Sequence, residues 1–149
     1  MNALMKRHIR RVVNWWPPFL GSGIRVTRLD PDWRAIDVEL RMHWWNANYV
    51  GTHYGGSLYS MTDPFYMLML IENLGHEYIV WDKSACIRFR RPGKGSVRAQ
   101  FRVSDEQLNG IRHALQTEQK VEPAFEVQVV DSEGQVVAEV QKVLSVRRQ

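Results

Sequence analysis

The segment from Asn48 to Asp63 holds a glycine pair and an aspartate that together could form a reactive site. At its centre, Gly55 and Gly56 stand directly ahead of an apolar stretch that we expect to be a helix. Two glycines at this position let a ligand or another backbone approach closely. The free amides at the start of a helix can donate to a developing oxyanion. The segment therefore predicts an anion-stabilising site at these glycines, although they could also serve only tight helix–sheet packing.

Asp63 follows about two turns inside the expected helix, among Met, Phe and Leu neighbours. An unpaired charge in such surroundings would be costly, so the carboxylate needs a partner, a pocket or a chemical task. The structural alternative is a carboxylate satisfied by neighbours such as Ser60 and Thr62. Pro64 comes next and removes a backbone donor, which predicts a kink that either exposes Asp63 or accommodates packing.

The helix that would position Asp63 spans about residues 56–74. It is apolar almost all round, so it must be surrounded by protein. Strands are expected before and after it, at 24–29, 34–44, 79–90, 97–103, 122–130 and 135–147. Alternation in 34–44 indicates one buried and one wet face, and Ser104 with Gln107 forms a capping-box pattern ahead of a short helix. These elements predict an α+β domain, an antiparallel sheet curled around one apolar helix.

The N-terminal segment is a separate feature. Residues 2–15 place apolar side chains at intervals of three and four, with basic residues opposite, and Pro17-Pro18 should end this amphipathic helix. We expect it to pack on its own domain or a partner subunit rather than lie on an anionic membrane. At 149 residues the chain predicts a single domain, 1–149, with 1–18 as a helical extension.

Composition narrows the class of protein. The chain has a net charge of +4, five scattered histidines and a single cysteine, Cys86, placed in an apolar strand where it should pack rather than react. No metal-ligand spacing is present, so we expect no metal. No apolar run is long enough to cross a bilayer and no signal-peptide pattern occurs, which favours a cytoplasmic protein. The basic charge alone selects no partner, and we expect no nucleic acid.

Three stretches together resemble the hot-dog thioesterases related to phenylacetic-acid and medium-chain acyl-CoA hydrolysis. The first is Asn48-x-x-Gly-Thr-x-x-Gly55-Gly56, with Asp63 eight positions after Gly55. The second is the aromatic strand ending in Arg90-Arg91-Pro92-Gly93-Lys94, and the third is the closing hairpin from Val129 to Ala138. The resemblance covers residues from about 23 to the end. It implies the hot-dog fold, an acyl-CoA or acyl-carrier-protein thioester as partner, and a homodimer or dimer of dimers.

The resemblance also assigns roles. It makes Asp63 the general base or nucleophile, the Gly56 amide the oxyanion donor, and Asn48 a residue that orients substrate or water. Gly55, Tyr54 and His53 would line the substrate, and Tyr54 stands where the family usually has histidine. Further substrate-binding candidates are Asp82, Ser84, Arg90, Arg91 and Lys94, the last three from a basic rim that would meet the pantetheine arm. No cofactor is implied beyond the coenzyme A of the substrate.

Three functions remain open. The first is a thioester hydrolase that uses Asp63 and the backbone amide. The second is a hot-dog protein that binds acyl groups without turnover. The third is an interaction protein that uses Trp15, Trp16 and the basic strand.

Overall fold

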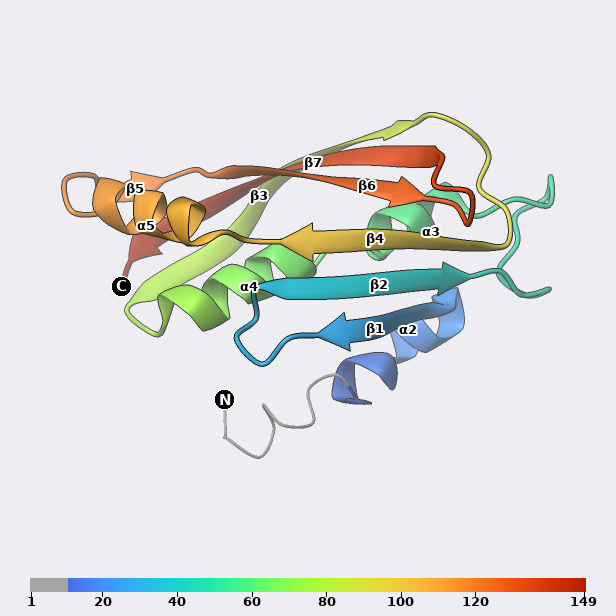
Figure 1. Cartoon of the computed structure of the whole chain (residues 1–149), viewed down its shortest axis with the longest axis horizontal. Helices are drawn as coiled ribbons and strands as arrows, with labels where there is room; N and C mark the ends of the chain where they lie inside the picture. Colours follow the sequence, from blue (N-terminus) through green and yellow to red (C-terminus); the bar gives the residue numbers. More distant parts are fainter. Residues whose placement is uncertain (1–10) are drawn as a thin grey trace.

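The computed structural model of the chain describes residues 11–149 (Figure 1). Its helices are α2 (Pro17–Ser22), α3 (Gly55–Ser60), α4 (Phe65–Leu74) and α5 (Asp105–Ala114). Its strands are β1 (Ile24–Leu29), β2 (Ala35–Arg41), β3 (Tyr78–Phe89), β4 (Ser96–Arg102), β5 (Lys120–Val121), β6 (Ala124–Val130) and β7 (Val136–Arg148). The expected strands and the helix after Ser104 are all present. The short β5 was not predicted.

One antiparallel sheet holds the strands in the order β1-β2-β4-β6-β7-β3, with β5 paired to β7. Register follows the hydrophobic alternation, since Ile36 lies opposite Phe101, and Leu40 lies opposite Val97. All four side chains are buried, as expected when paired positions share one face. A slip of one residue would turn them all to solvent, so burial fixes the register.

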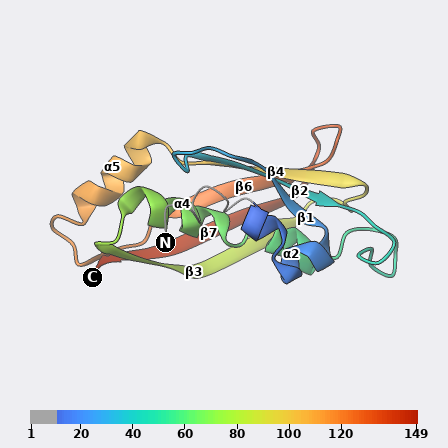
Figure 2. The same ribbon diagram turned by 90° about the horizontal axis from the view of Figure 1, so that it is seen from below.

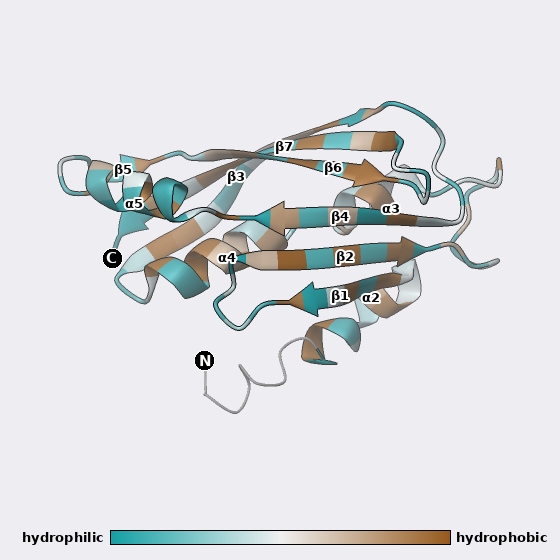
Figure 3. Ribbon diagram, viewed as in Figure 1, coloured by the Kyte–Doolittle hydropathy of each residue, from teal (hydrophilic) through white to brown (hydrophobic). Residues whose placement is uncertain are grey.

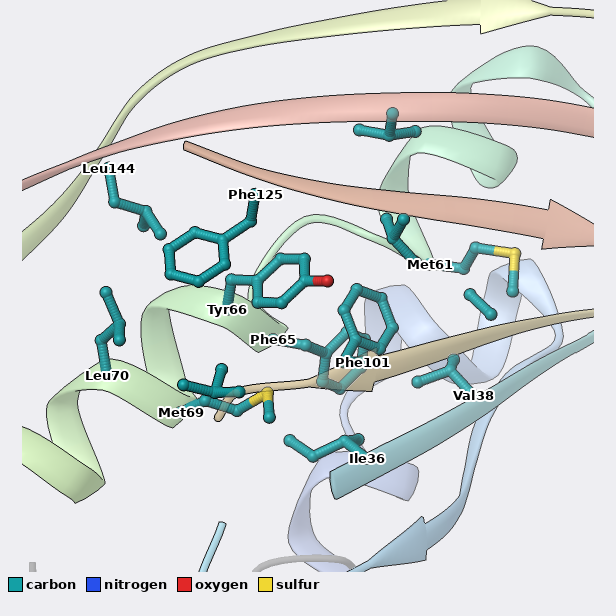
Figure 4. Close-up of a cluster of buried hydrophobic side chains, with 14 of the residues drawn as sticks. Ile36, Val38, Met61, Phe65, Tyr66, Met69, Leu70, Phe101, Phe125 and Leu144 are labelled. Atoms are coloured by element: carbon teal, nitrogen blue, oxygen red, sulfur yellow. The ribbon is translucent and has the colours of Figure 1, made fainter. Parts of the chain in front are cut away.

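The sheet curls around α3 and α4. Figure 2 shows these helices in its concave side, between β3 below and β2 and β4 above. Hydropathy colouring places apolar residues on α4 and in alternation along the strands (Figure 3). In the close-up of the core, Phe65 and Tyr66 of α4 meet Phe101 and Phe125 of the sheet (Figure 4). The apolar helix is thus covered by protein, as its composition predicted.

The central helix occupies the expected place but is interrupted at 61–64. Short turn bonds close α3, from Thr62 N to the Tyr59 carbonyl and from Asp63 N to the Ser60 carbonyl. Pro64 cannot donate a backbone bond, and α4 begins directly after it. The kink expected at Pro64 is therefore a full break between two helices, with Asp63 inside the break.

The N-terminal expectation is met only in part. Residues 11–14 are helical, whereas 1–10 lie outside the described residues. Pro17 and Pro18 do not simply end a helix, because they occupy the first turn of α2, where a proline nitrogen needs no acceptor. Asn14 ties this segment to β1, since its side chain exchanges two hydrogen bonds with the backbone of Val26.

Three side chains differ from their predicted surroundings. Cys86 is exposed because it lies opposite Gln141 on the outer face of the sheet, so the expectation of a packed thiol is wrong. Trp44 is 89% exposed because β2 ends at Arg41 and the inward alternation does not reach residue 44. Glu39, on the supposedly wet face of β2, is buried and paired with Arg41 at 2.8 Å.

Candidate functional site

Asp63 lies at the break between α3 and α4, with its side chain 47% exposed. The phenol of Tyr59, one turn earlier, donates to carboxylate oxygen Oδ1 over 2.9 Å. The ammonium of Lys142 donates to the same oxygen over 3.0 Å. In the described part of the chain both contacts fall on Oδ1, so Oδ2 is the oxygen left to meet water or a substrate. A half-exposed carboxylate with one fixed oxygen can act as a base or a nucleophile.

Lys142 is the unexpected member of this cluster. It sits on the inner face of β7 between Val140 and Leu144, and its side chain is 0% exposed. Its ammonium contacts the backbone carbonyl and Oδ1 of Asp63, and lies 2.9 Å from Oδ1 of Asp82. It also lies 5.8 Å from the centre of the Tyr59 ring. Lysine is almost never fully buried unless it is paired, and here two carboxylates pair with it.

A β-bulge brings Asp82 into the cluster. Asp82 pairs with Leu144 and Ser84 pairs with Val143, so Lys83 is the extra residue on β3. Cross-strand partners share a face and neighbours along a strand alternate. Asp82 therefore lies on the face of Lys142, whereas Ser84 lies on the opposite face with Val143. Of the two predicted polar residues at this point of β3, the structure brings only Asp82 to Asp63.

Tyr59 is a stable hydrogen-bond donor in this setting. Burial, the hydrogen bond to Asp63, and the charges of Asp63 and Asp82 raise the pKa of the Tyr59 phenol from 10.0 to about 12. Each cause disfavours a phenolate beside two carboxylates. Tyr59 therefore stays protonated across the physiological range and continues to donate to Asp63.

The loop before α3 is organised by Asn48. Its amide nitrogen donates to the Thr52 hydroxyl and to the His53 carbonyl, and its oxygen accepts from the backbone amides of Val50 and Thr52. Both donors and both lone pairs are thus engaged within the loop. A role for Asn48 in orienting substrate stays a prediction, and it would require some of these bonds to be exchanged.

His53 joins this loop to the β3–β4 turn. The side chain is 4% exposed, ring nitrogen Nε2 lies 2.7 Å from the Gly95 carbonyl, and the backbone amide bonds the Gly93 carbonyl. Burial lowers the pKa of the imidazole, and the bond to Gly95 offsets part of that effect. These contacts give His53 a supporting place behind the loop; contact with substrate stays a prediction.

The two glycines begin α3, and Tyr54 gives no side-chain cap there. The first amides of a helix have no acceptor within it, so those of Gly55 and Gly56 can serve a ligand. Both positions are crowded. A Cβ on Gly56 would lie 2.4 Å from the Tyr54 ring, and one on Gly55 would lie 3.1 Å from the Phe89 ring. A larger residue at either position would therefore have to displace the ring of Tyr54 or Phe89, both of which are exposed.

The predicted basic rim is divided. Arg90 is held by Glu139, with two contacts of 2.6 and 2.8 Å, which directs it along the outer face of the sheet. Arg91 and Lys94 are exposed on the turn after β3, the turn on which His53 docks. Of the three rim residues predicted to bind substrate, only Arg91 and Lys94 lack a carboxylate partner within residues 11–149.

Sequence reasoning missed Tyr59 and Lys142. Lys142 had a signal, because it interrupts an apolar alternation formed by Ala138, Val140, Leu144 and Val146. A charge in the inward phase of a strand requires a buried partner. Tyr59 had a weaker signal, its spacing of four residues from Asp63 on a helix.

Residues 11–149 bring together no group of three His, Cys, Asp or Glu side chains that could hold a metal ion. Over the same residues, no helix is both long and apolar enough to cross a membrane.

Solved structures resemble the chain over nearly its whole length. PA5026 from Pseudomonas aeruginosa, a protein of unknown function described as a probable thioesterase, aligns with a TM-score of 0.82 and 24% identity, over 100% of this chain and 97% of its own. Thioesterase HI1161 from Haemophilus influenzae aligns with a TM-score of 0.67 and 12% identity, over 95% of this chain and 90% of its own. PaaI from the E. coli phenylacetic acid degradation operon aligns with a TM-score of 0.65 and 16% identity, over 96% of this chain and 91% of its own.

Together with the sheet wrapped around α3 and α4, these likenesses place the chain in the class of hot-dog-fold proteins, as the sequence resemblance predicted. Within that class it belongs to the DUF4442 family, a domain of unknown function, whose family model matches residues 5–146. A comparison with curated protein sequences found no match.

Proposed function

We propose that the protein hydrolyses a thioester of an acyl group carried by coenzyme A or an acyl carrier protein. The observation that supports this most is the state of Asp63. It lies half-exposed in a helix break, one oxygen is held by Tyr59 and Lys142, and the other is available. A carboxylate used only for packing needs neither the exposure nor the break.

The reaction can follow two routes. In the first, Asp63 accepts a proton from water while the water oxygen attacks the thioester carbonyl carbon. In the second, Asp63 attacks that carbon itself, and water then hydrolyses the resulting anhydride. Both routes form an oxyanion for the Gly56 amide to stabilise, and in both the collapse of this first intermediate cleaves the carbon–sulfur bond and the thiolate takes up a proton. In the second route this cleavage forms the anhydride, and its hydrolysis by water completes the reaction.

The substrate class follows from the surroundings. Asp63 stands beside the apolar core, with Met61 and Phe65 buried on either side of the break, which favours an acyl chain over a polar group. Arg91 and Lys94 are exposed cations that fit the phosphates of a coenzyme A or phosphopantetheine arm. The hot-dog neighbours described as thioesterases add a likeness of fold to this argument.

A homodimer is part of the proposal. The edge strand β3 is long, and Trp81 and Phe89 on it are 65% and 56% exposed. A long apolar edge with free backbone groups is a ready template for another strand. Pairing of two β3 edges would cover these residues and place the partner's surface beside Asp82 and Asp63. The complete substrate site would then lie between two subunits.

One observation favours the second candidate, an acyl-binding protein without turnover. Asp63 is paired with a fully buried lysine, and such a pair can also be a purely structural device. This alternative predicts that the protein binds acyl-CoA but releases no thiol, and that Asp63 matters for stability rather than rate.

The experiment is a measurement of free-thiol release from short, medium, long and aryl acyl-CoAs by the wild type and by Asp63→Asn. Glu106→Gln, which removes a carboxylate charge at the exposed start of α5, is the matched control. Turnover of at least one substrate that depends on Asp63 and not on Glu106 supports the hydrolase. A folded wild type that is inert with every substrate but binds one of them supports the acyl-binding alternative.

A further inference from the structure

Lys142 is held in place by contacts with two aspartates. Its ammonium donates hydrogen bonds to the Asp63 carbonyl and to Oδ1 of Asp63, and it forms an ion pair with Oδ1 of Asp82 at 2.9 Å. The side chain is 0% exposed, so the ammonium is shielded from solvent. Lys142 can therefore act on a reaction only through the groups that it bonds.

The contact with the Asp63 carbonyl depends on the helix break. The first backbone acceptor of α4 is the Pro64 carbonyl, which takes the Leu68 amide at 3.0 Å. The Asp63 carbonyl lies one residue before that point, and Lys142 bonds it. One ammonium thus fixes both the backbone and the carboxylate of Asp63. This double attachment sets the direction of the side chain.

We infer that Lys142 is a positioning residue for Asp63: its buried ammonium holds the backbone and one carboxylate oxygen of Asp63, and so turns Oδ2 to the open side of the helix break. This inference rests on the proposed hydrolase function. Asp82, on the inner face of β3 because of the bulge at Lys83, holds the ammonium from the other side.

Charge explains why a lysine and a second aspartate occur together. Asp63 and Asp82 bring two negative charges to a partly covered site, and Lys142 brings one positive charge. The formal sum is one negative charge, which is that of Asp63 alone. Tyr59, the other titratable group in contact, stays neutral with a pKa raised to about 12 by burial first and then by its bond to Asp63. Asp82 thus offsets the formal charge of the lysine.

The test uses two variants, because loss of Lys142 alone leaves two carboxylates facing each other and can unfold the protein. Lys142→Met removes the ammonium at similar volume. Lys142→Met with Asp82→Asn also removes the second carboxylate, which restores the formal charge of the cluster. Lys120→Met, at an exposed pair with Glu122, is the control. Equal folding of the double variant and the wild type is checked first.

In the folded double variant we expect kcat to fall at least about tenfold, the order for a lost hydrogen bond to a charged group, with KM nearly unchanged. A purely structural lysine would leave kcat at its wild-type value once folding is restored. A folded double variant with wild-type kcat would overturn the inference.

A second readout does not need turnover. The Lys142 ammonium should give a slowly exchanging 15N NMR signal in the wild type, and Asp63→Asn should shift it. A signal that exchanges like that of free lysine and ignores Asp63→Asn would overturn the positioning role. If the NMR coupling is present but the wild type hydrolyses no thioester, the hydrolase proposal fails while the Lys142–Asp63 unit stands.

Discussion

The phenol of Tyr59 donates to Oδ1 of Asp63 over 2.9 Å, across the last turn of α3. This bond spans four residues and joins the end of the helix to the break that follows it. It shares Oδ1 with the ammonium of Lys142. Oδ1 of Asp63, the candidate base, is thus held by two donors: Tyr59 from the adjacent helix α3 and Lys142 from β7.

Tyr59→Phe tests the local donor. The substitution keeps the ring and removes the hydroxyl, so we expect kcat/KM to fall roughly tenfold, as for a lost bond to a charged acceptor, with little change in stability. Tyr49→Phe, in a fully exposed side chain, is the control. Full activity of Tyr59→Phe would mean that Lys142 alone orients the carboxylate.

High pH should weaken the fold. The pKa values of Tyr59 and Tyr66 are both raised from 10.0 to about 12, chiefly by burial. Between these values the unfolded chain releases tyrosine protons that the folded chain retains, so the free energy of unfolding falls as pH rises from 10 towards 12. Denaturant titrations across this range measure the loss. Tyr59→Phe should also remove a tyrosinate absorbance step near pH 12, and an unchanged titration would contradict the assignment.

Acid should weaken the fold through His53. Burial holds the pKa of this imidazole below its ordinary value of 6.5, so the unfolded chain binds the proton more readily. The free energy of unfolding is therefore greatest above pH 6.5 and falls as pH drops below it. We expect His53→Gln to flatten this part of the stability curve measured by denaturant unfolding. His113→Gln, at an exposed position in the last turn of α5, should leave it unchanged. Equal slopes for wild type and His53→Gln would contradict the prediction.

The β3 edge should form the dimer contact. Trp81 is 65% exposed, and an aspartate in its place would put a charge where two apolar strands meet. We expect Trp81→Asp to shift the protein from dimer to monomer in sedimentation experiments and to lower activity with it. Trp44→Asp, at a side chain 89% exposed outside the strand, is the comparison. A dimer that survives Trp81→Asp would place the contact elsewhere.

Much of the fold could be predicted because local patterns determine it. Alternation indicated β2, β4 and β6, the Ser104–Gln107 capping box is present with both of its bonds, and the apolar helix is buried. Pro64 signalled the interruption beside Asp63. Cys86 and Trp44 were misplaced, because the register of β3 on β7 puts Cys86 on the outer face and because β2 ends before Trp44, and neither follows from a local pattern.

The site was less predictable, because its members come from distant elements. The resemblance pointed to Asp63 and the glycines, which lie within ten residues of each other. The contacts of Lys142 with Asp63 and Asp82 depend on the pairing of β3 with β7 and on the bulge at Lys83. Neither the pairing partner nor the bulge follows from the composition of a single strand. The available signal was Lys142 among the apolar inward-facing residues of its strand. This pattern indicates that the lysine has a buried partner, but it does not predict which residue that partner is.

The most direct test of the account is the ratio of kcat/KM for wild type and Asp63→Asn on the acyl-CoA that the wild type hydrolyses fastest. Both proteins are compared at equal folding and oligomeric state, with Glu106→Gln as the reference. The account predicts a loss of about a hundredfold or more for Asp63→Asn, the order for a general base, and no loss for Glu106→Gln. A folded Asp63→Asn variant that hydrolyses the thioester at the wild-type rate would contradict it.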